Sequence, residues 1–336
     1  MTIRHATALA HPNIALAKYW GKTPGSDNAP AVPSLSVTLA GLSTTTTVRF
    51  DEGREGDVFE LNGRAADPRA AARVSTMLDE VRVEAGLTLR ASVVSRNDFP
   101  TAAGLASSAS GFAALATAAR AAAGLPFDPA RASNLARRAS ASAARSLYGG
   151  YVELGAGEPG KAVFLPARPV ANGDSLPLRV LVAVTTERTK DTSSTDGMNH
   201  TTRTSPYYAA WLALAPEVCA RVRAAIVAGD LEALGVAAEE SALAMHASAL
   251  AARPGVLYWI GATVEVIAAV RELRAGGTGA WCTMDAGPHV KVLCAPADAE
   301  RVGARLGAVA GVLRVLEARP GDGARLVTDE AGRAPA

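Results

Sequence analysis

The sequence predicts an α+β protein built from two lobes. The first third of the chain switches between segments rich in β-branched residues and a segment whose apolar residues recur with helical spacing. The second half is mainly helical and then returns to short apolar strands. With 336 residues, 49% of them hydrophobic and 20% charged, the chain can bury a large core, as one big domain or as two lobes sharing a cleft.

Local patterns predict the elements of the N-terminal part. The threonine-rich residues 43–50 favour a strand, and a strand at 58–61 is followed by Asn62-Gly63, a dipeptide typical of tight hairpin turns. One apolar face over residues 69–84 predicts a helix. The other elements expected before residue 155 are strands at 87–95 and 151–154, helices at 106–123 and 129–138, and a loop or tight turn at 140–150.

The C-terminal part begins after a segment, residues 166–174, that contains proline and glycine and is expected to separate the lobes. A strongly apolar strand is predicted at 178–185. The elements expected after it are helices at 206–250, 263–275 and 298–309, strands at 278–283, 290–295 and 312–317, and a frayed end of about a dozen residues.

The charge balance argues against a nucleic-acid partner or an anionic membrane, because 34 basic residues face 32 acidic ones. The basic residues comprise 29 arginines and only five lysines, a bias that a GC-rich coding sequence explains. Where background pressure favours arginine, a retained lysine is a candidate for a place that arginine cannot fill. The five lysines are Lys18, Lys22, Lys161, Lys190 and Lys291.

Cysteine content and apolar runs indicate a cytoplasmic protein. Cys219, Cys282 and Cys294 are odd in number and lack metal-ligand spacing, which favours structural thiols in a reducing compartment. The N-terminus lacks an apolar signal core. The most apolar run, residues 112–124, is interrupted by Arg120 and is too short to span a bilayer.

Two glycine-rich segments could hold phosphate. Residues 155–162 nearly match a nucleotide-binding loop, but they lack its final hydroxyl, and strand-like residues 163–166 follow where a helix is required. We therefore interpret this segment as a glycine-proline turn with an exposed Lys161. Residues 100–111 follow a predicted strand and begin a predicted helix. Their small side chains and the free N–H groups at the start of the helix could bind a polyphosphate. A helix of small residues packed on a sheet would have the same sequence pattern.

The second segment, Pro-x-x-x-Gly-Leu-x-Ser-Ser-Ala, resembles the phosphate loop of the GHMP kinase superfamily. Seven blocks, in the same order over nearly 300 residues, resemble the diphosphomevalonate decarboxylase family within it. The blocks begin at Asn13 (NIALAKYWGK), Ser34 (SLSVTL), Asn97 (NDFPTAAGLASS), Arg145 (RSLYGGY), Lys190 (KDTSSTDGM), Met245 (MHA) and Asp285 (DAGP).

This resemblance implies ATP-dependent decarboxylation of mevalonate 5-diphosphate, with Mg²⁺, to isopentenyl diphosphate, ADP, phosphate and CO₂. It implies the two-lobed GHMP kinase fold and an active-site cleft between the lobes. Residues 1–177 would form an N-terminal lobe of ribosomal-protein-like topology with the phosphate loop, and residues 178–336 an α/β C-terminal lobe with the catalytic aspartate. The family also implies a homodimer, with a small-molecule substrate as the partner.

The same resemblance assigns roles to individual residues. Asp285 and Lys18 match the catalytic pair: a tertiary alcohol needs a carboxylate to orient it or take its proton, and an ammonium keeps that carboxylate ionised. Arg145 matches the arginine that binds the substrate carboxylate through its planar guanidinium. The other substrate-binding matches are Asn13, Tyr19, Lys22, Ser140, Ser142, Ser194 and Thr195. The nucleotide-binding matches are Pro100, Ala103, Gly104, Leu105, Ala106, Ser107 and Ser108, with Ser107 also assigned to the metal.

The sequence departs from the family pattern at three places. Ala139 and Ala141 replace glycines before Arg145, Val32-Pro33 replaces Asn-Ser, and Thr23-Pro24 follows Gly-Lys where a charged pair is frequent. These departures bear on specificity, so decarboxylation of mevalonate 5-phosphate, or phosphorylation of mevalonate at its 3-hydroxyl, is the alternative activity. A noncatalytic regulator on the same fold is a further alternative, which the retained Asp285 and Lys18 disfavour.

Overall fold

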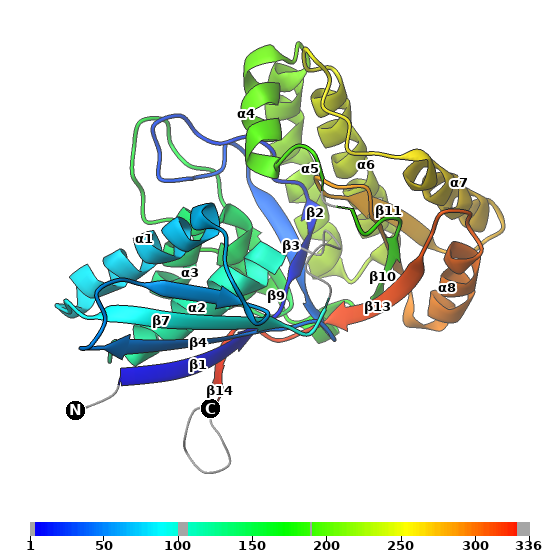
Figure 1. The fold of residues 1–336 in the computed structure, drawn as a ribbon. Helices are drawn as coiled ribbons and strands as arrows, with labels where there is room; N and C mark the ends of the chain where they lie inside the picture. Colours follow the sequence, from blue (N-terminus) through cyan, green and yellow to red (C-terminus); the bar gives the residue numbers. More distant parts are fainter. Residues whose placement is uncertain (1–3, 100–106, 189, 328–336) are drawn as a thin grey trace.

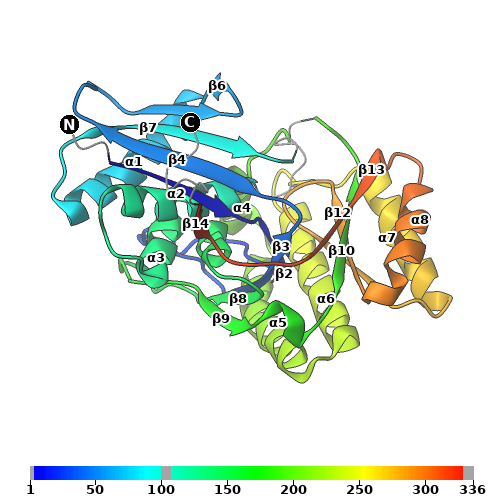
Figure 2. The ribbon, with the colours of Figure 1, turned by 90° about the horizontal axis from the view of Figure 1, so that it is seen from below.

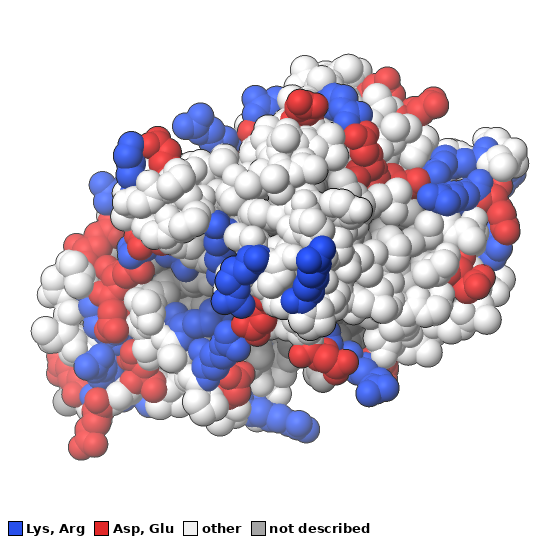
Figure 3. Space-filling view, turned by 90° about the horizontal axis from the view of Figure 1, so that it is seen from above, with Lys and Arg blue, Asp and Glu red and all other residues white. Residues whose placement is uncertain are grey.

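The computed structural model describes residues 4–99, 107–188 and 190–327, which form two sheets with helices packed against both. The mixed order of helices and strands agrees with the predicted α+β class (Figure 1). Figure 3 shows one face of the molecule, where basic and acidic side chains are interspersed.

The first sheet has six strands in the order β14-β1-β4-β7-β5-β6. The strands β4 and β7 alternate buried and more exposed residues, which leaves one face for a core. Helices α1, α2 and α3 cover that face (Figure 2). The bounds are β1 Arg4–Ala10, β4 Thr44–Asp51, β5 Val58–Leu61, β6 Arg64–Ala65, β7 Arg90–Asn97, β14 Arg325–Val327, α1 Pro68–Ala85, α2 Ser107–Ala122 and α3 Pro129–Ala139.

The second sheet has eight strands, seven in the order β11-β12-β10-β13-β3-β8-β9, with β2 pairing β3. Its strand β10 (Arg179–Val184) is buried on both faces: Val182 packs with helices α5 and α6, while Leu181 and Ala183 pack with α7 and α8. This burial explains why the strand is a continuous apolar run. The other bounds are β2 Asn13–Ala17, β3 Ser34–Ala40, β8 Tyr151–Leu154, β9 Arg168–Ala171, β11 Ala280–Met284, β12 Val290–Cys294, β13 Arg314–Pro320, α4 Ser194–Thr204, α5 Tyr208–Ala228, α6 Leu231–Leu250, α7 Gly261–Ala275 and α8 Ala299–Gly307.

The two sheets exchange segments of the chain. Strands β2, β3, β8 and β9 lie in one sheet with β10 to β13, and β14 returns to pair with β1. Residues close to the N-terminus are thereby brought beside residues that follow β11. The division of the chain after residue 177 stays a prediction.

Two local expectations need correction, and a third segment contains a strand that was not expected. The expected loop at 140–150 contains a buried 3₁₀ helix, η1 (Ala141–Leu147), because its small residues allow a tight winding against α2 and α3. The segment at 166–174 contains β9, an edge strand that tolerates its proline, and its role as a boundary between lobes stays a prediction. Residues 163–166 form no strand; Arg137 donates to the carbonyl of Val163 instead.

Candidate active site

The strand β2 ends at a lysine that is held from both sides. A shift of register between Ala15 and Ala17 interrupts the β2–β3 ladder, and the carbonyl of Ala15 accepts a hydrogen bond from Lys18 Nζ at 2.9 Å. The backbone N–H of Lys18 donates to Ser241 Oγ of α6 at 2.9 Å. The lysine side chain is 1% exposed. Its ammonium therefore has a fixed position at the end of β2.

Asp285 lies where β2 meets the β11–β12 hairpin. It follows β11 directly, and the N–H of Gly287 donates to its carbonyl in a tight turn. Lys18 Nζ lies 2.7 Å from Asp285 Oδ1, although 267 positions separate the two residues in sequence. Lys291 Nζ of β12 lies 3.1 Å from Asp285 Oδ2. Each oxygen of this carboxylate thus has its own ammonium.

Burial and neighbouring charges shift the pKa values of this pair. Burial raises the pKa of Asp285, but Lys18 and Lys291 outweigh burial and hold it well below the ordinary range of a carboxyl. Burial lowers the pKa of Lys18 from 10.5 to about 8, against the opposing effect of Asp285. Both groups are therefore mainly ionised at neutral pH.

Arg145, in η1, adds a third buried cation. Its Nε donates to Ser36 Oγ at 2.9 Å and its Nη1 to Ser34 Oγ at 2.7 Å, both from β3. Burial lowers its pKa to about 10, which leaves it protonated at neutral pH. Lys18 and Lys291 contact one carboxylate and Arg145 interacts with it electrostatically, so the site has excess positive charge that an anionic ligand would compensate.

Two buried polar atoms beside these groups, Asn13 Oδ1 and Tyr19 Oη, have no hydrogen-bond partner among the described residues. The amide nitrogen of Asn13 donates to the Ser142 carbonyl at 2.9 Å and to Ser146 Oγ at 2.8 Å, which fixes the amide. Burial raises the pKa of Tyr19, so its hydroxyl stays protonated. Such orphaned atoms fit a polar ligand that would complete their hydrogen bonds.

The N-terminus of α4 approaches the same turn. Lys190 Nζ donates to Ser194 Oγ at 2.8 Å and to the Ala286 carbonyl at 3.1 Å, and Ser193 caps the helix. Burial and repulsion by Arg73 of α1 lower the pKa of Lys22, and attraction by Asp196 of α4 opposes that shift. The segment after β2 thus lies near both α1 and α4.

Comparison with known proteins agrees with this geometry. Residues 10–164 match the diphosphomevalonate decarboxylase-like N-terminal domain, and residues 180–317 match the mevalonate 5-diphosphate decarboxylase C-terminal domain. The chain belongs to the diphosphomevalonate decarboxylase family. Diphosphomevalonate decarboxylase mvd1 of Aspergillus fumigatus is 35% identical over 329 residues, which cover 92% of this chain and 81% of that one.

Solved structures of mevalonate diphosphate decarboxylases show that the chain has their fold, the two-lobed GHMP kinase fold. The Staphylococcus aureus crystal structure has a TM-score of 0.91 and 36% identity, covering 97% of this chain and 98% of that one. A structure described as "MDDEF in complex with MVAPP, AMPPCP and Magnesium" has a TM-score of 0.89 and 38% identity, covering 97% and 99%.

The family blocks that the sequence separates are partly brought together. Lys18 and Asp285 form the expected pair, and Asn13 contacts the Ser142 carbonyl, while Ser140 Oγ lies 3.3 Å from Ser142 Oγ. Ser194 and Thr195 open α4. Five predicted nucleotide-binding residues lie outside the described residues: Pro100, Ala103, Gly104, Leu105 and Ala106.

Ser107 and Ser108 are the first two residues of α2, whose first turn contains no acidic residue. The free N–H groups of this turn and the absence of nearby negative charge on it suit phosphate oxygens. Within residues 4–99, 107–188 and 190–327, no three histidine, cysteine, aspartate or glutamate side chains are grouped to hold a metal.

The contact between Lys291 and Asp285 was not predicted from the sequence, although Lys291 was one of the five lysines singled out because lysine is scarce in this chain. His246 is buried against Tyr258 and Trp259, and burial lowers its pKa to about 3. Lys161 is exposed beside Glu158, in agreement with the turn that was expected there.

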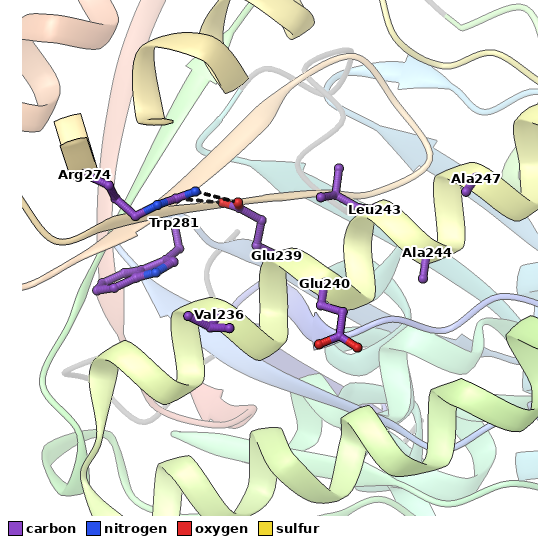
Figure 4. A pocket seen from close by; sticks show the side chains of 8 residues that line it. All are labelled: Val236, Glu239, Glu240, Leu243, Ala244, Ala247, Arg274 and Trp281. Atoms are coloured by element: carbon purple, nitrogen blue, oxygen red, sulfur yellow. Dashed lines mark hydrogen bonds and ion pairs between the residues drawn. The ribbon is translucent and has the colours of Figure 1, made fainter. Parts of the chain in front are cut away.

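A cavity of about 550 Å³ lies on another face of α6, away from the residues above (Figure 4). An ion pair between Glu239 and Arg274, at 2.8 Å, borders it. The N–H of Cys282 also donates to Glu239. This carboxylate is therefore fully engaged in fixing α6 to β11.

Proposed function

We propose that the chain catalyses the ATP-dependent decarboxylation of mevalonate 5-diphosphate to isopentenyl diphosphate, ADP, phosphate and CO₂. The observation that carries the proposal is an ionised Asp285 between two buried ammonium groups, with the buried Arg145 guanidinium interacting with it. The family membership of the chain supports the same reaction.

Asp285 would orient the tertiary 3-hydroxyl of the substrate and take its proton as the oxygen–phosphorus bond to the γ-phosphate forms and the bond between that phosphorus and ADP breaks. The carbon–oxygen bond would then break, with its electron pair leaving on the phosphate, so that positive charge develops at carbon 3; Asp285 would pass its proton to the departing phosphate and become ionised again. The Asp285 carboxylate would stabilise the positive charge until the carbon–carbon bond to the substrate carboxylate breaks, CO₂ is released and the electron pair of that bond forms the double bond. The pKa of Asp285, held low by its lysines, suits the second role because the group readily gives up a proton.

The anionic ends of the substrate would be bound by different groups. Arg145 would hold the carboxylate, with Asn13 beside it, since a planar guanidinium can bind both carboxylate oxygens. Tyr19 and Lys22 would bind the diphosphate. The hydroxyl groups that would complete substrate binding are those of Ser140, Ser142, Ser194 and Thr195.

The nucleotide would bind at the start of α2, where Ser107 and Ser108 would contact phosphate and Ser107 would also face Mg²⁺. The relative described with AMPPCP, an ATP analogue, and magnesium supports this choice of ligands. Magnesium would neutralise phosphate charge when bound. The residues of this chain would orient the phosphates through backbone N–H groups and the two hydroxyls.

A substrate panel tests the proposal. Enzyme, ATP and Mg²⁺ are mixed separately with mevalonate, its 5-phosphate and its 5-diphosphate, and ADP and CO₂ are measured independently. We expect equal amounts of both products from the 5-diphosphate. If CO₂ forms mainly from mevalonate 5-phosphate, that compound is the substrate and the proposed one is wrong. If every substrate yields ADP without CO₂, the chain is not a decarboxylase.

We also propose an oligomeric state and a cellular location for the protein. We expect a homodimer, as the family resemblance implies, which light scattering after size exclusion would test. Cytoplasmic location rests on three free, buried thiols, since free thiols persist in a reducing compartment. No helix among the described residues is long and apolar enough to cross a membrane.

A further inference from the structure

We propose that Lys291 is a positioning residue for this reaction: it holds Oδ2 of Asp285 so that the carboxylate keeps one orientation toward the substrate hydroxyl. The proposal rests on the function proposed above and adds a residue to its machinery. The first observation is a lysine ammonium that is buried within a β-strand. Lys291 is the second residue of β12, which lies between β10 and β11, and its side chain is 1% exposed.

The position of Lys291 is one that an apolar residue usually occupies. Its side chain is buried in a strand between two others, and across the ladder with β10 it faces Val182 of an apolar core, while Val290 and Val292 lie on the opposite face of the sheet. A buried ion pair rarely stabilises a protein more than apolar residues of similar volume, because desolvation of the charges offsets their attraction. Within the described part of the chain, Asp285 is the one acidic group paired with Lys291. Fold stability therefore does not account for this lysine, whereas control of Asp285 does.

The register of the hairpin explains how the contact forms. Thr283 pairs with Lys291 across the β11–β12 ladder, so both side chains lie on one face of the sheet. Asp285 is two residues beyond Thr283 and continues on that face, diagonal to Lys291. A long lysine side chain spans that diagonal, and its Nζ lies 3.1 Å from Oδ2.

The two lysines constrain Asp285 in different ways. Lys18 belongs to the segment after β2 and also bonds to the Ala15 carbonyl, so it connects Asp285 with the N-terminal part of the chain. Lys291 belongs to the same hairpin as Asp285 and would remain beside it if the two parts moved. With one oxygen bound from each side, the carboxylate cannot rotate about its last bond without losing an ion pair.

The closing experiment compares Lys291→Met with Lys161→Met. Methionine has similar length and suits a buried strand, while Lys161 is an exposed lysine on a turn. We expect Lys291→Met to keep its thermal midpoint and to lose about 10- to 100-fold in kcat, with KM for both substrates within about threefold. Lys161→Met should match the wild type.

The pH dependence of kcat/KM is a second measurement, which a lysine with a purely structural role would leave unchanged. Since Lys18 must be protonated to pair with Asp285, kcat/KM should fall at high pH, and this fall is the alkaline limb of the profile. The charged groups that shift the pKa of Lys18 are Asp285 after β11, Lys291 in β12 and Arg145 in η1, and Lys18 in turn helps to lower the pKa of His246 in α6. Lys291 repels the protonated form of Lys18, so its removal should shift the alkaline limb of kcat/KM to higher pH.

Each outcome decides the proposal. A folded Lys291→Met enzyme with wild-type kcat and an unmoved alkaline limb would overturn it. If that variant misfolds, Lys291→Ala assayed with added ethylammonium replaces it: saturable recovery of kcat supports the proposal, and no recovery refutes it. Wild-type enzyme that releases no CO₂ would instead refute the proposed function.

Discussion

Lys18→Arg keeps the positive charge beside Asp285 and changes only its shape, so it isolates the geometric role of the lysine. Lys18 Nζ lies 2.7 Å from Asp285 Oδ1 and 2.9 Å from the Ala15 carbonyl, and the side chain is 1% exposed. Its backbone N–H is fixed by Ser241. A guanidinium is planar and broader, so it cannot occupy this space without displacing Asp285 or the substrate hydroxyl.

The size of the effect follows from that displacement. Overpacking a buried position costs about 1–3 kcal/mol, and misplacing a reacting group by about 1 Å can lower the rate about 100-fold. We therefore expect kcat to fall about 100-fold, which corresponds to about 2.7 kcal/mol in the activation free energy. ATP affinity should stay within about twofold, because the substitution is at the substrate hydroxyl and not at α2.

The pH dependence gives an independent signature. The pKa of Lys18 is about 8, so the lysine loses its proton as the pH rises through 8, and the ion pair with Asp285 is then lost. In the wild type, kcat/KM should fall above pH 8. Arginine does not deprotonate in this range, so Lys18→Arg should lack that alkaline limb.

Initial rates of CO₂ and ADP release from pH 6 to 10 would measure both effects, with Lys161→Arg as the matched control on an exposed lysine. A Lys18→Arg enzyme with kcat within threefold of wild type would refute the geometric argument. An alkaline limb that persists at the same pH would show that another group titrates there.

Three further variants test the remaining assignments. Asp285→Asn should lower kcat at least about 1,000-fold while ATP binding, measured by calorimetry, is retained, because it removes the charge that both lysines hold. Arg145→Lys should raise KM for the diphosphate substrate and lower kcat in steady-state assays, since an ammonium cannot donate in the planar, forked pattern that reaches two hydroxyls at once. Tyr19→Phe should raise KM several-fold with an unchanged thermal midpoint by calorimetry, because the hydroxyl has no hydrogen-bond partner among the described residues to lose.

Much of the fold could be predicted because its elements depend on local patterns. The Asn62-Gly63 hairpin formed at its predicted place, since its turn requires the left-handed backbone that both residues adopt. The 3₁₀ helix η1 was missed because its residues have no helical periodicity and are held by packing against α2 and α3. Strands β1 and β14 were missed for a similar reason, since their pairing joins the two ends of the described chain.

In the site, too, some contacts could be expected from the sequence and others could not. The contact between Lys18 and Asp285 was expected from family motifs, and no local rule could have placed residues 267 positions apart beside each other. The position of Lys291 against Asp285 depends on the register of one hairpin, Thr283 opposite Lys291, which composition does not specify. The scarcity of lysine indicated that Lys291 could have a specific role, but it did not predict which residue Lys291 contacts.

The use of lysine here, in a chain that otherwise favours arginine, has a physical reason. Two cations must reach the two oxygens of one carboxylate and still leave room for a substrate hydroxyl, and a compact ammonium does this where a guanidinium would fill the space. Arg145 has the opposite task, to present a broad planar group, and there arginine is retained with neutral serines as its hydrogen-bond partners. The three cations exceed the single carboxylate in charge, so an anionic substrate would lower the electrostatic energy of the site on binding, which favours it over neutral compounds of similar shape.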